Sequence, residues 1–177
     1  MSYLFIHAGR WLAPFAQFLA VLFLLANLLF WVMPEWAEYA ARSFSGLPAS
    51  TPLTLTTGTK FLGGGLSTLY LGTLAYALFT ISEIFRVFAA GNCLSSGVGA
   101  RLHRFGLALI LFGASTPVVR ALMTIIVTIQ NAEGERMLII AFSGNDFVIM
   151  LVGMLMVMLG YAFREAAAIA EENRQIV

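Results

Sequence analysis

The sequence predicts an all-α integral membrane protein, a four-transmembrane-helix bundle with its N- and C-termini in the cytoplasm. Hydrophobic residues make up 60% of the 177 residues and charged residues only 11%, whereas soluble domains carry about 25% charged residues. Four apolar stretches are each long enough to cross a hydrocarbon core, which needs about 20 helical residues. Lys and Arg are distributed unequally between the two sides of these stretches. We therefore expect residues 1–177 to form one membrane domain.

The first predicted span covers residues 11–33 and ends before Pro34, which cannot continue a helix in the usual way. Gln17 and Asn27 interrupt its apolar run, and no small-residue cleavage site follows promptly. These features indicate a retained helix rather than a signal peptide. The other spans are predicted at residues 61–88, 105–129 and 146–163.

Two loops, 34–60 and 130–145, are expected outside the cell, and loop 89–104 and tail 164–177 in the cytoplasm. The side that holds both termini carries six basic residues near the span ends: Arg10, Arg86, Arg101, Arg104, Arg164 and Arg174. The other side carries three: Arg42, Lys60 and Arg136. Because basic residues accumulate on the cytoplasmic side, the bias predicts a multi-pass protein of the bacterial cytoplasmic (inner) membrane.

The outer loops contain segments that suggest local structure. Residues 34–42 place apolar side chains at helical spacing opposite acidic and basic ones, which is typical of a short helix lying at the interface. Residues 53–57 alternate between apolar and polar, and residues 136–142 form a short apolar run. The two runs would form a small hairpin-like β cap beside the helix, or equally well irregular loops, since short runs are ambiguous.

Arg120 is the strongest functional lead, because it lies within the third apolar span. A guanidinium at that depth costs roughly 2.5–3.5 kcal/mol on insertion scales. It lies about 22 Å above Phe105 at 1.5 Å per residue, at a level that Asn27 also reaches. Asp146 is the preferred counter-charge. The sequence leaves open whether this is a structural ion pair or an anion-binding or gating site.

Other polar residues of the spans recur at helical spacing. Thr116 and Thr124 share one face with Arg120, and Tyr76 and Glu83 share a face of the second span. These polar residues, with Asn27 and Asp146, form the predicted intramembrane polar cluster. Glu83 lies near the cytoplasmic end, where Arg86, Arg164 or basic loop residues are its expected partners. Most threonines and glycines at such positions serve helix packing alone.

Several function classes find no support in the sequence. It contains no nucleophile–base pattern, phosphate-binding loop or zinc signature, and its single cysteine, Cys93, makes no metal cluster. A net charge of +1 suggests no nucleic-acid-binding surface. We therefore expect no enzyme activity, no cofactor and no metal, and no direct contact with nucleic acid.

Two segments resemble a known family. One runs from Glu83-Ile84-Phe85-Arg86 through Gly91 to Arg101-Leu102-His103-Arg104-Phe105-Gly106, and the other includes Phe163-Arg164-Glu165 and the ending 170–177. Together they resemble the YoaS-like family of small four-span bacterial membrane proteins of unknown function. The resemblance implies a small cytoplasmic helix-turn-helix regulator as a partner. The expected partner-binding residues are Arg101, Arg104, Glu171, Glu172 and Asn173.

These observations predict a non-enzymatic membrane protein with a sensory or regulatory role. The alternative is a small transporter or channel subunit that acts as a homo-oligomer, with an intramembrane anion site at Arg120. A membrane enzyme that uses Glu83 or Asp146 has the weakest support, because no second catalytic group lies at matching depth.

Overall fold

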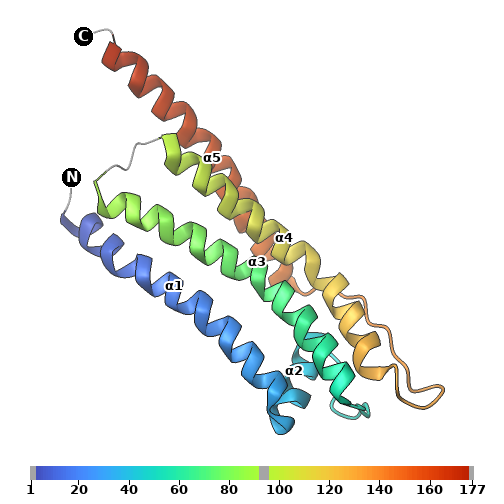
Figure 1. The fold of residues 1–177 in the computed structure, drawn as a ribbon. Helices are drawn as coiled ribbons and strands as arrows, with labels where there is room; N and C mark the ends of the chain where they lie inside the picture. The colour runs from blue at the N-terminus through green and yellow to red at the C-terminus, as the bar shows by residue number, and fades with distance from the viewer. Residues whose placement is uncertain (1–2, 92–95, 176–177) are drawn as a thin grey trace.

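A computed structural model describes the backbone of residues 3–91 and 96–175, and the side chains of residues 7–91 and 97–172. The described chain forms five helices: α1 (Tyr3–Val32), α2 (Pro34–Ser45), α3 (Thr57–Ala89), α4 (Ser96–Thr128) and α5 (Gly144–Gln175) (Figure 1). The four long helices are each long and apolar enough to cross a membrane. The predicted all-α class with four candidate spans is confirmed.

The four long helices pack in chain order. α1 lies against α3, α3 against α4, and α4 against α5, whereas the described residues of α1 and α5 do not meet (Figure 1). The bundle is therefore open, with the helices in a row. The short helix α2 contacts α1, α3 and α4 at one end of this row. That end is called the α2 end below, and the opposite end, near which both chain ends lie, the termini end.

Small side chains allow α1 and α3 to approach closely. Ser82 of α3 donates a 2.9 Å hydrogen bond to the Ala13 carbonyl of α1. Near the α2 end, the Trp31 indole donates at 2.9 Å to the Ser67 hydroxyl, and a Cβ on Gly63 would collide with the Trp31 ring. Close approach of this kind is how helices associate within lipid, where water does not drive their packing.

α4 and α5 pack through glycines spaced seven residues apart. A Cβ on Gly106 would collide with the backbone of α5 at Gly153, and a Cβ on Gly153 would collide with α4 in return. Gly99 and Gly160 face each other in the same way one heptad closer to the termini end. The seven-residue spacing keeps one seam in contact along both helices.

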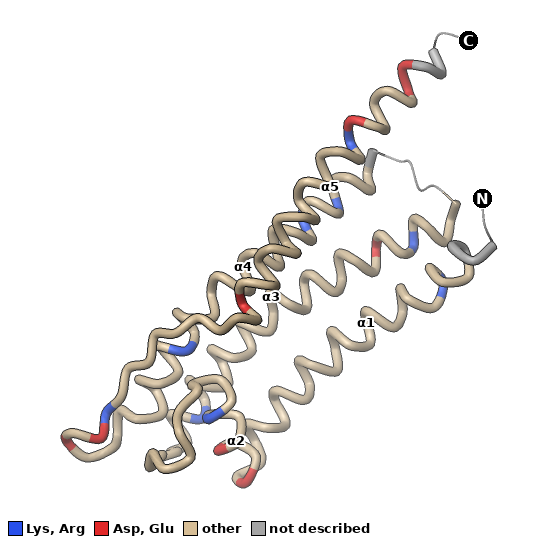
Figure 2. Tube along the Cα trace, turned by 180° about the vertical axis from the view of Figure 1, so that it is seen from behind, with Lys and Arg blue, Asp and Glu red and all other residues tan. Residues whose placement is uncertain are grey.

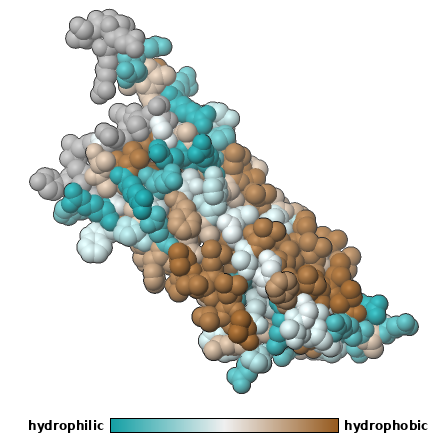
Figure 3. Space-filling view, in the orientation of Figure 1, coloured by the Kyte–Doolittle hydropathy of each residue, from teal (hydrophilic) through white to brown (hydrophobic). Residues whose placement is uncertain are grey.

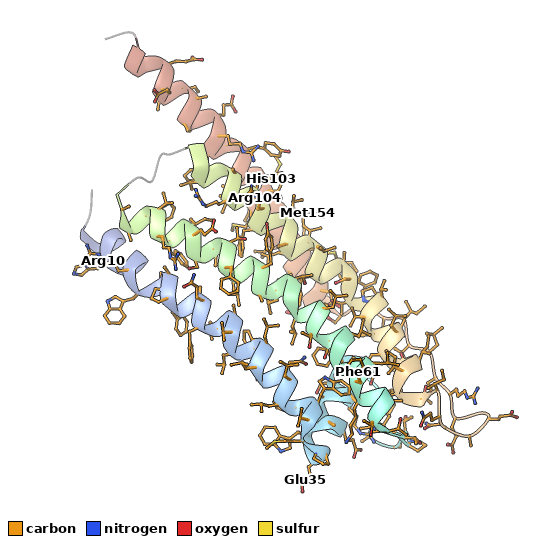
Figure 4. All side chains as sticks on the ribbon, viewed as in Figure 1. Arg10, Glu35, Phe61, His103, Arg104 and Met154 are labelled. Carbon is orange, nitrogen blue, oxygen red and sulfur yellow. The ribbon has the colours of Figure 1, made fainter. Side chains whose placement is uncertain are left out.

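The surface has the polarity expected of a chain surrounded by lipid. An apolar band lies between more polar regions toward the two ends of the helices (Figure 3). Charged residues are sparse along the middle of the helices (Figure 2). Arg10 and Glu35 lie at opposite ends of the molecule (Figure 4). These features support a multi-pass membrane protein.

The helical part of the predicted cap is confirmed by α2. Of the two alternatives for the runs in the loops, the β hairpin is wrong and irregular loops are found, since no strand occurs in the described chain. The two loops meet through side chains instead. The Asn131 amide donates to the Pro52 carbonyl at 2.7 Å, and the Thr54 hydroxyl donates to Asn131 Oδ1 at 2.9 Å. The amides of Met137 and Ile139 and the carbonyl of Ala141 bond to side chains of α4 rather than to a second strand.

Candidate functional site

Polar residues recur once per helical turn along one face of α4 near the α2 end. We call these four residues, Thr116, Arg120, Thr124 and Thr128, the polar stripe. Its three threonines are buried, and Arg120 is half-buried. Thr124 and Thr128 each donate a hydrogen bond to a carbonyl of α4 one turn earlier, so their oxygens remain free to accept another.

The polar stripe binds the backbone of the chain that follows α4. This extended segment, residues 137–143, runs back along α4 from Thr128 toward Arg120. The amide of Met137 donates to the Thr128 hydroxyl at 3.3 Å, and the amide of Ile139 donates to the Thr124 hydroxyl at 3.4 Å. Arg120 Nη1 then donates to the Ala141 carbonyl at 3.4 Å.

The spacing of the polar stripe along α4 matches the spacing of alternate residues along the extended segment because of backbone geometry. One step of four residues along a helix is about 6 Å, and two residues of extended chain span about 6.6 Å. Alternate residues of the extended segment therefore meet successive turns of α4, and those between point away: Leu138, Ile140 and Phe142 are exposed. Backbone groups in lipid need hydrogen-bond partners within the protein. The polar stripe supplies such partners to the extended segment and so has a structural role.

The start of α5 has its own polar partners. Asp146 Oδ2 accepts from the Ser143 amide at 2.7 Å, and the Ser143 hydroxyl accepts from the Asp146 amide at 3.3 Å. This reciprocal arrangement is a capping box, with Ser143 as N-cap and Asp146 as the third helical residue. Asp146 is only 4% exposed. One oxygen of its carboxylate thus binds the backbone at the helix end.

A cavity of about 240 Å³ lies between the polar stripe and the start of α5. Its wall includes residues of four helices and of the loop before α5: Ser43, Phe44, Tyr70, Phe112, Thr116, Val119, Arg120, Ser143, Asn145, Asp146 and Ile149. The Tyr70 hydroxyl lies 3.0 Å from the Thr116 hydroxyl. The Tyr70 ring stacks on Phe112 with the ring centroids 4.4 Å apart. We call this space the Arg120 cavity.

Arg120 has few protein partners for a half-buried charge. Its 3.4 Å bond to Ala141 uses one of five guanidinium N–H groups. Asp146 attracts it electrostatically, but the ion pairs within 4.0 Å in the described chain are Arg42–Glu38 and Arg101–Glu83. The direct Arg120–Asp146 contact expected from the sequence is therefore not formed, because Asp146 is turned toward the Ser143 amide.

The predicted polar cluster is divided among separate places. Thr116, Arg120 and Asp146 line the Arg120 cavity, and Thr124 lies one turn beyond it. Asn27 instead donates to Thr68 of α3 at 2.9 Å and lines a different cavity.

Glu83 pairs with Arg101 at 3.1 Å, as expected of a basic loop partner. Tyr76 and Arg104 line an open groove between α3 and α4. Glu171 and Glu172 are exposed near the end of α5. The side chain of Asn173, and Cys93, lie outside the described residues.

Sequence reasoning missed several residues of the Arg120 cavity. Ser143 had a detectable signal, since Ser-x-x-Asp before an apolar run is a capping-box pattern. Tyr70 and Phe112 read as ordinary apolar residues of their spans. Phe44 follows the predicted interface helix, so only the packing of α2 reveals its place.

The chain matches no protein-family profile, no curated protein and no solved structure. The resemblance to the YoaS-like family stays a prediction.

Proposed function

We propose that this protein is a non-enzymatic integral membrane protein with a sensory or regulatory role, and that its signal is a small anion bound in the Arg120 cavity. The observation that carries the proposal is the position of Arg120. Its guanidinium lines a cavity of about 240 Å³ with one long hydrogen bond and no ion pair within the described chain. Charged residues within a span normally have partners, so the N–H groups of this half-buried guanidinium that no protein atom accepts favour a ligand that accepts hydrogen bonds.

The charges around the cavity limit the charge that a ligand can carry. The start of α5 contributes a partial positive charge from its backbone amides, and Arg120 contributes a full one. Asp146 on the same wall repels anions and opposes a second negative charge on the ligand. A singly charged anion, of the size of a short carboxylate, fits these conditions best.

α5 offers a route from the cavity to the termini end. It begins at the capping box of the cavity wall and continues without a break to Gln175. Among the described helices it packs only on α4, so it can shift without disturbing the α1–α3 pair. We propose that it carries the signal to a cytoplasmic partner, which the family resemblance suggests is a small helix-turn-helix regulator, bound through Glu171, Glu172 and Asn173 together with Arg101 and Arg104.

Isothermal titration of the full chain in nanodiscs tests the ligand. Acetate is expected to bind with saturation and more tightly than sulfate. Arg120→Gln is expected to weaken acetate binding roughly ten- to hundred-fold, as removal of a charged hydrogen bond predicts. Arg136→Gln, an exposed site in the same outer region, is the matched control and should bind as the native chain does. Equal binding by both variants would refute the proposal.

A deletion tests the regulatory half separately. Removal of residues 171–177 should leave acetate binding unchanged, and should abolish co-purification of a cytoplasmic partner and alter transcript levels. If the deletion changes no transcript and no partner is recovered with the native chain, the regulatory role is wrong.

The transporter alternative has less support. The open row of helices encloses no path within one described chain, so transport would need further copies. Solute exchange in liposomes that Arg120→Gln abolishes would favour it over the sensory role.

A further inference from the structure

An open groove of about 740 Å³ lies between α3 and α4. Small residues hollow it out: a Cβ on Gly65 or Gly72 of α3 would stand in open space, and Ala108 is the small residue on the α4 side. The exposed leucines Leu69 and Leu111 line it as well. Its volume lies within the range of about 300–1,000 Å³ that ligand sites occupy. We call this space the α3–α4 groove.

The groove is apolar along most of its length and polar at one end. Thr68 and Thr73 donate their hydroxyl protons to carbonyls of α3 itself, so they offer no donor to a ligand. The side-chain donors that remain among the described lining residues are the Arg104 guanidinium and the Tyr76 hydroxyl. Each is the lining residue nearest the termini end on its own helix. The two donors therefore lie at the same end of the groove.

Arg104 has no protein partner within the described chain. It is exposed, and neither a hydrogen bond nor an ion pair links it to another described residue. The neighbouring charges nearer the termini end, Arg101 and Glu83, pair with each other at 3.1 Å and so offset each other. The polar end of the groove thus holds one cation without a counter-charge from these residues, and charge complementarity favours an anionic ligand.

The dimensions of the groove fit a lipid of one leaflet. α4 has 33 residues and is about 50 Å long, so a hydrocarbon core of about 30 Å leaves about 10 Å of helix at each end. Arg104 lies about 12 Å from the start of α4 at Ser96, close to the edge of a core centred on that helix. On α3, Tyr76 and Gly65 are about 16.5 Å apart along the helix axis, about the thickness of one leaflet.

We propose that the α3–α4 groove binds an anionic phospholipid, with its phosphate at the Arg104 guanidinium and one acyl chain along Gly72 and Gly65. Basic sites between transmembrane helices bind anionic headgroups. The lipid carries one net negative charge, because the groove offers one unpaired cation, whereas a zwitterionic headgroup would bring a positive charge of its own to Arg104. A headgroup at Arg104 leaves the acidic residues of α5 for the regulator proposed above.

Photolabelling of the full chain in phosphatidylcholine nanodiscs tests the proposal. Two probes at low mole fraction carry the same diazirine acyl chain, one on phosphatidylglycerol and one on phosphatidylcholine, and the labelled residues are mapped by mass spectrometry. At Leu69 and Leu111 the phosphatidylglycerol probe should give roughly ten-fold more label, as one charged hydrogen bond predicts. At Leu151 and Leu155, which are exposed on α5 outside the groove, the two probes should label equally.

Three variants make the test specific. Arg104→Gln should remove the preference for phosphatidylglycerol at the groove. Gly72→Leu fills the groove while keeping Arg104, and should also abolish the preference; the variant should fold, because a side chain there enters open space. Arg10→Gln is the matched control, because Arg10 is an exposed cation at the same end of the molecule but on α1, and it should leave the preference unchanged.

The proposal is overturned if Arg104→Gln keeps the preference. It is also overturned if Gly72→Leu keeps it, since the headgroup would then bind at Arg104 without a chain in the groove. A native chain that sediments as a dimer, with Gly72→Leu as a monomer, would overturn it in favour of a second copy in the groove. Arg120→Gln should leave the preference unchanged, and the nanodiscs contain no cytoplasmic partner, so this test and those of the proposed function can fail independently.

Discussion

The guanidinium of Arg120 is always charged, and its five N–H groups exceed what the neighbouring chain offers it. One of them binds the Ala141 carbonyl. Asp146, the nearest acid by sequence reasoning, is bound to the backbone at the start of α5. The residue thus has a structural role through Ala141, and its remaining N–H groups are the donors on which the proposed anion site depends.

Thr124 is the clearest test of the polar stripe at the scale of one residue. Thr124→Val keeps the shape but removes the acceptor for the Ile139 amide. We expect a loss of about 1–3 kcal/mol in the free energy of unfolding and faster hydrogen exchange at Ile139. Thr80→Val is the control, since the buried Thr80 hydroxyl bonds only to its own helix. An unchanged exchange rate at Ile139 would contradict the assignment.

At the scale of elements, sequence patterns identified the helices better than the connections. The four spans and α2 follow from apolar length and helical spacing. In the apolar run 136–142, Leu138, Ile140 and Phe142 point away from α4, as alternate residues of a strand would, but the partner of the run is a helix. Pairing of an extended chain with threonine side chains has no simple sequence signature, so the predicted β cap was wrong. The spacing of Thr116, Arg120, Thr124 and Thr128 identified one face without showing what covers it.

Glycine substitutions separate packed helix faces from open ones. Gly106→Leu would force a side chain into the backbone of α5, and we expect it to destabilise the α4–α5 pair by at least 1–3 kcal/mol, as overpacking does. Gly65→Leu faces open space on α3 and should change stability little. Thermal unfolding in one detergent compares the two, and equal losses would show that the α4–α5 contact is placed incorrectly.

At the scale of the whole molecule, the open row leaves both outer helices with a single long neighbour: α3 for α1, and α4 for α5. Composition predicted a bundle and an even number of crossings, which puts both chain ends on one side. Composition did not predict that the four helices lie in a row, because the order of neighbours depends on which small residues pack against each other between helices. Gly99, Gly106 and Gly153 select α5 as the neighbour of α4, and nothing in the sequence alone pairs them.

The topology makes a direct prediction. Reporter fusions at the two termini should both be active in the cytoplasm, because the excess of Lys and Arg lies at that end. A reporter in the loop between α4 and α5 should give the opposite result. Termini on different sides would mean that one of the four helices does not cross.

The central claim is that Arg120 binds an anion, and the side-chain Nε–Hε signals of the arginines report on it most directly. Arg120→Lys assigns the Arg120 signal in the NMR spectrum of the native chain. Titration with acetate should shift that signal with saturation, while the Arg42 signal stays in place because Glu38, Pro48 and Thr51 already occupy its guanidinium. An Arg120 signal that does not move, or moves no more than that of Arg42, would contradict the account.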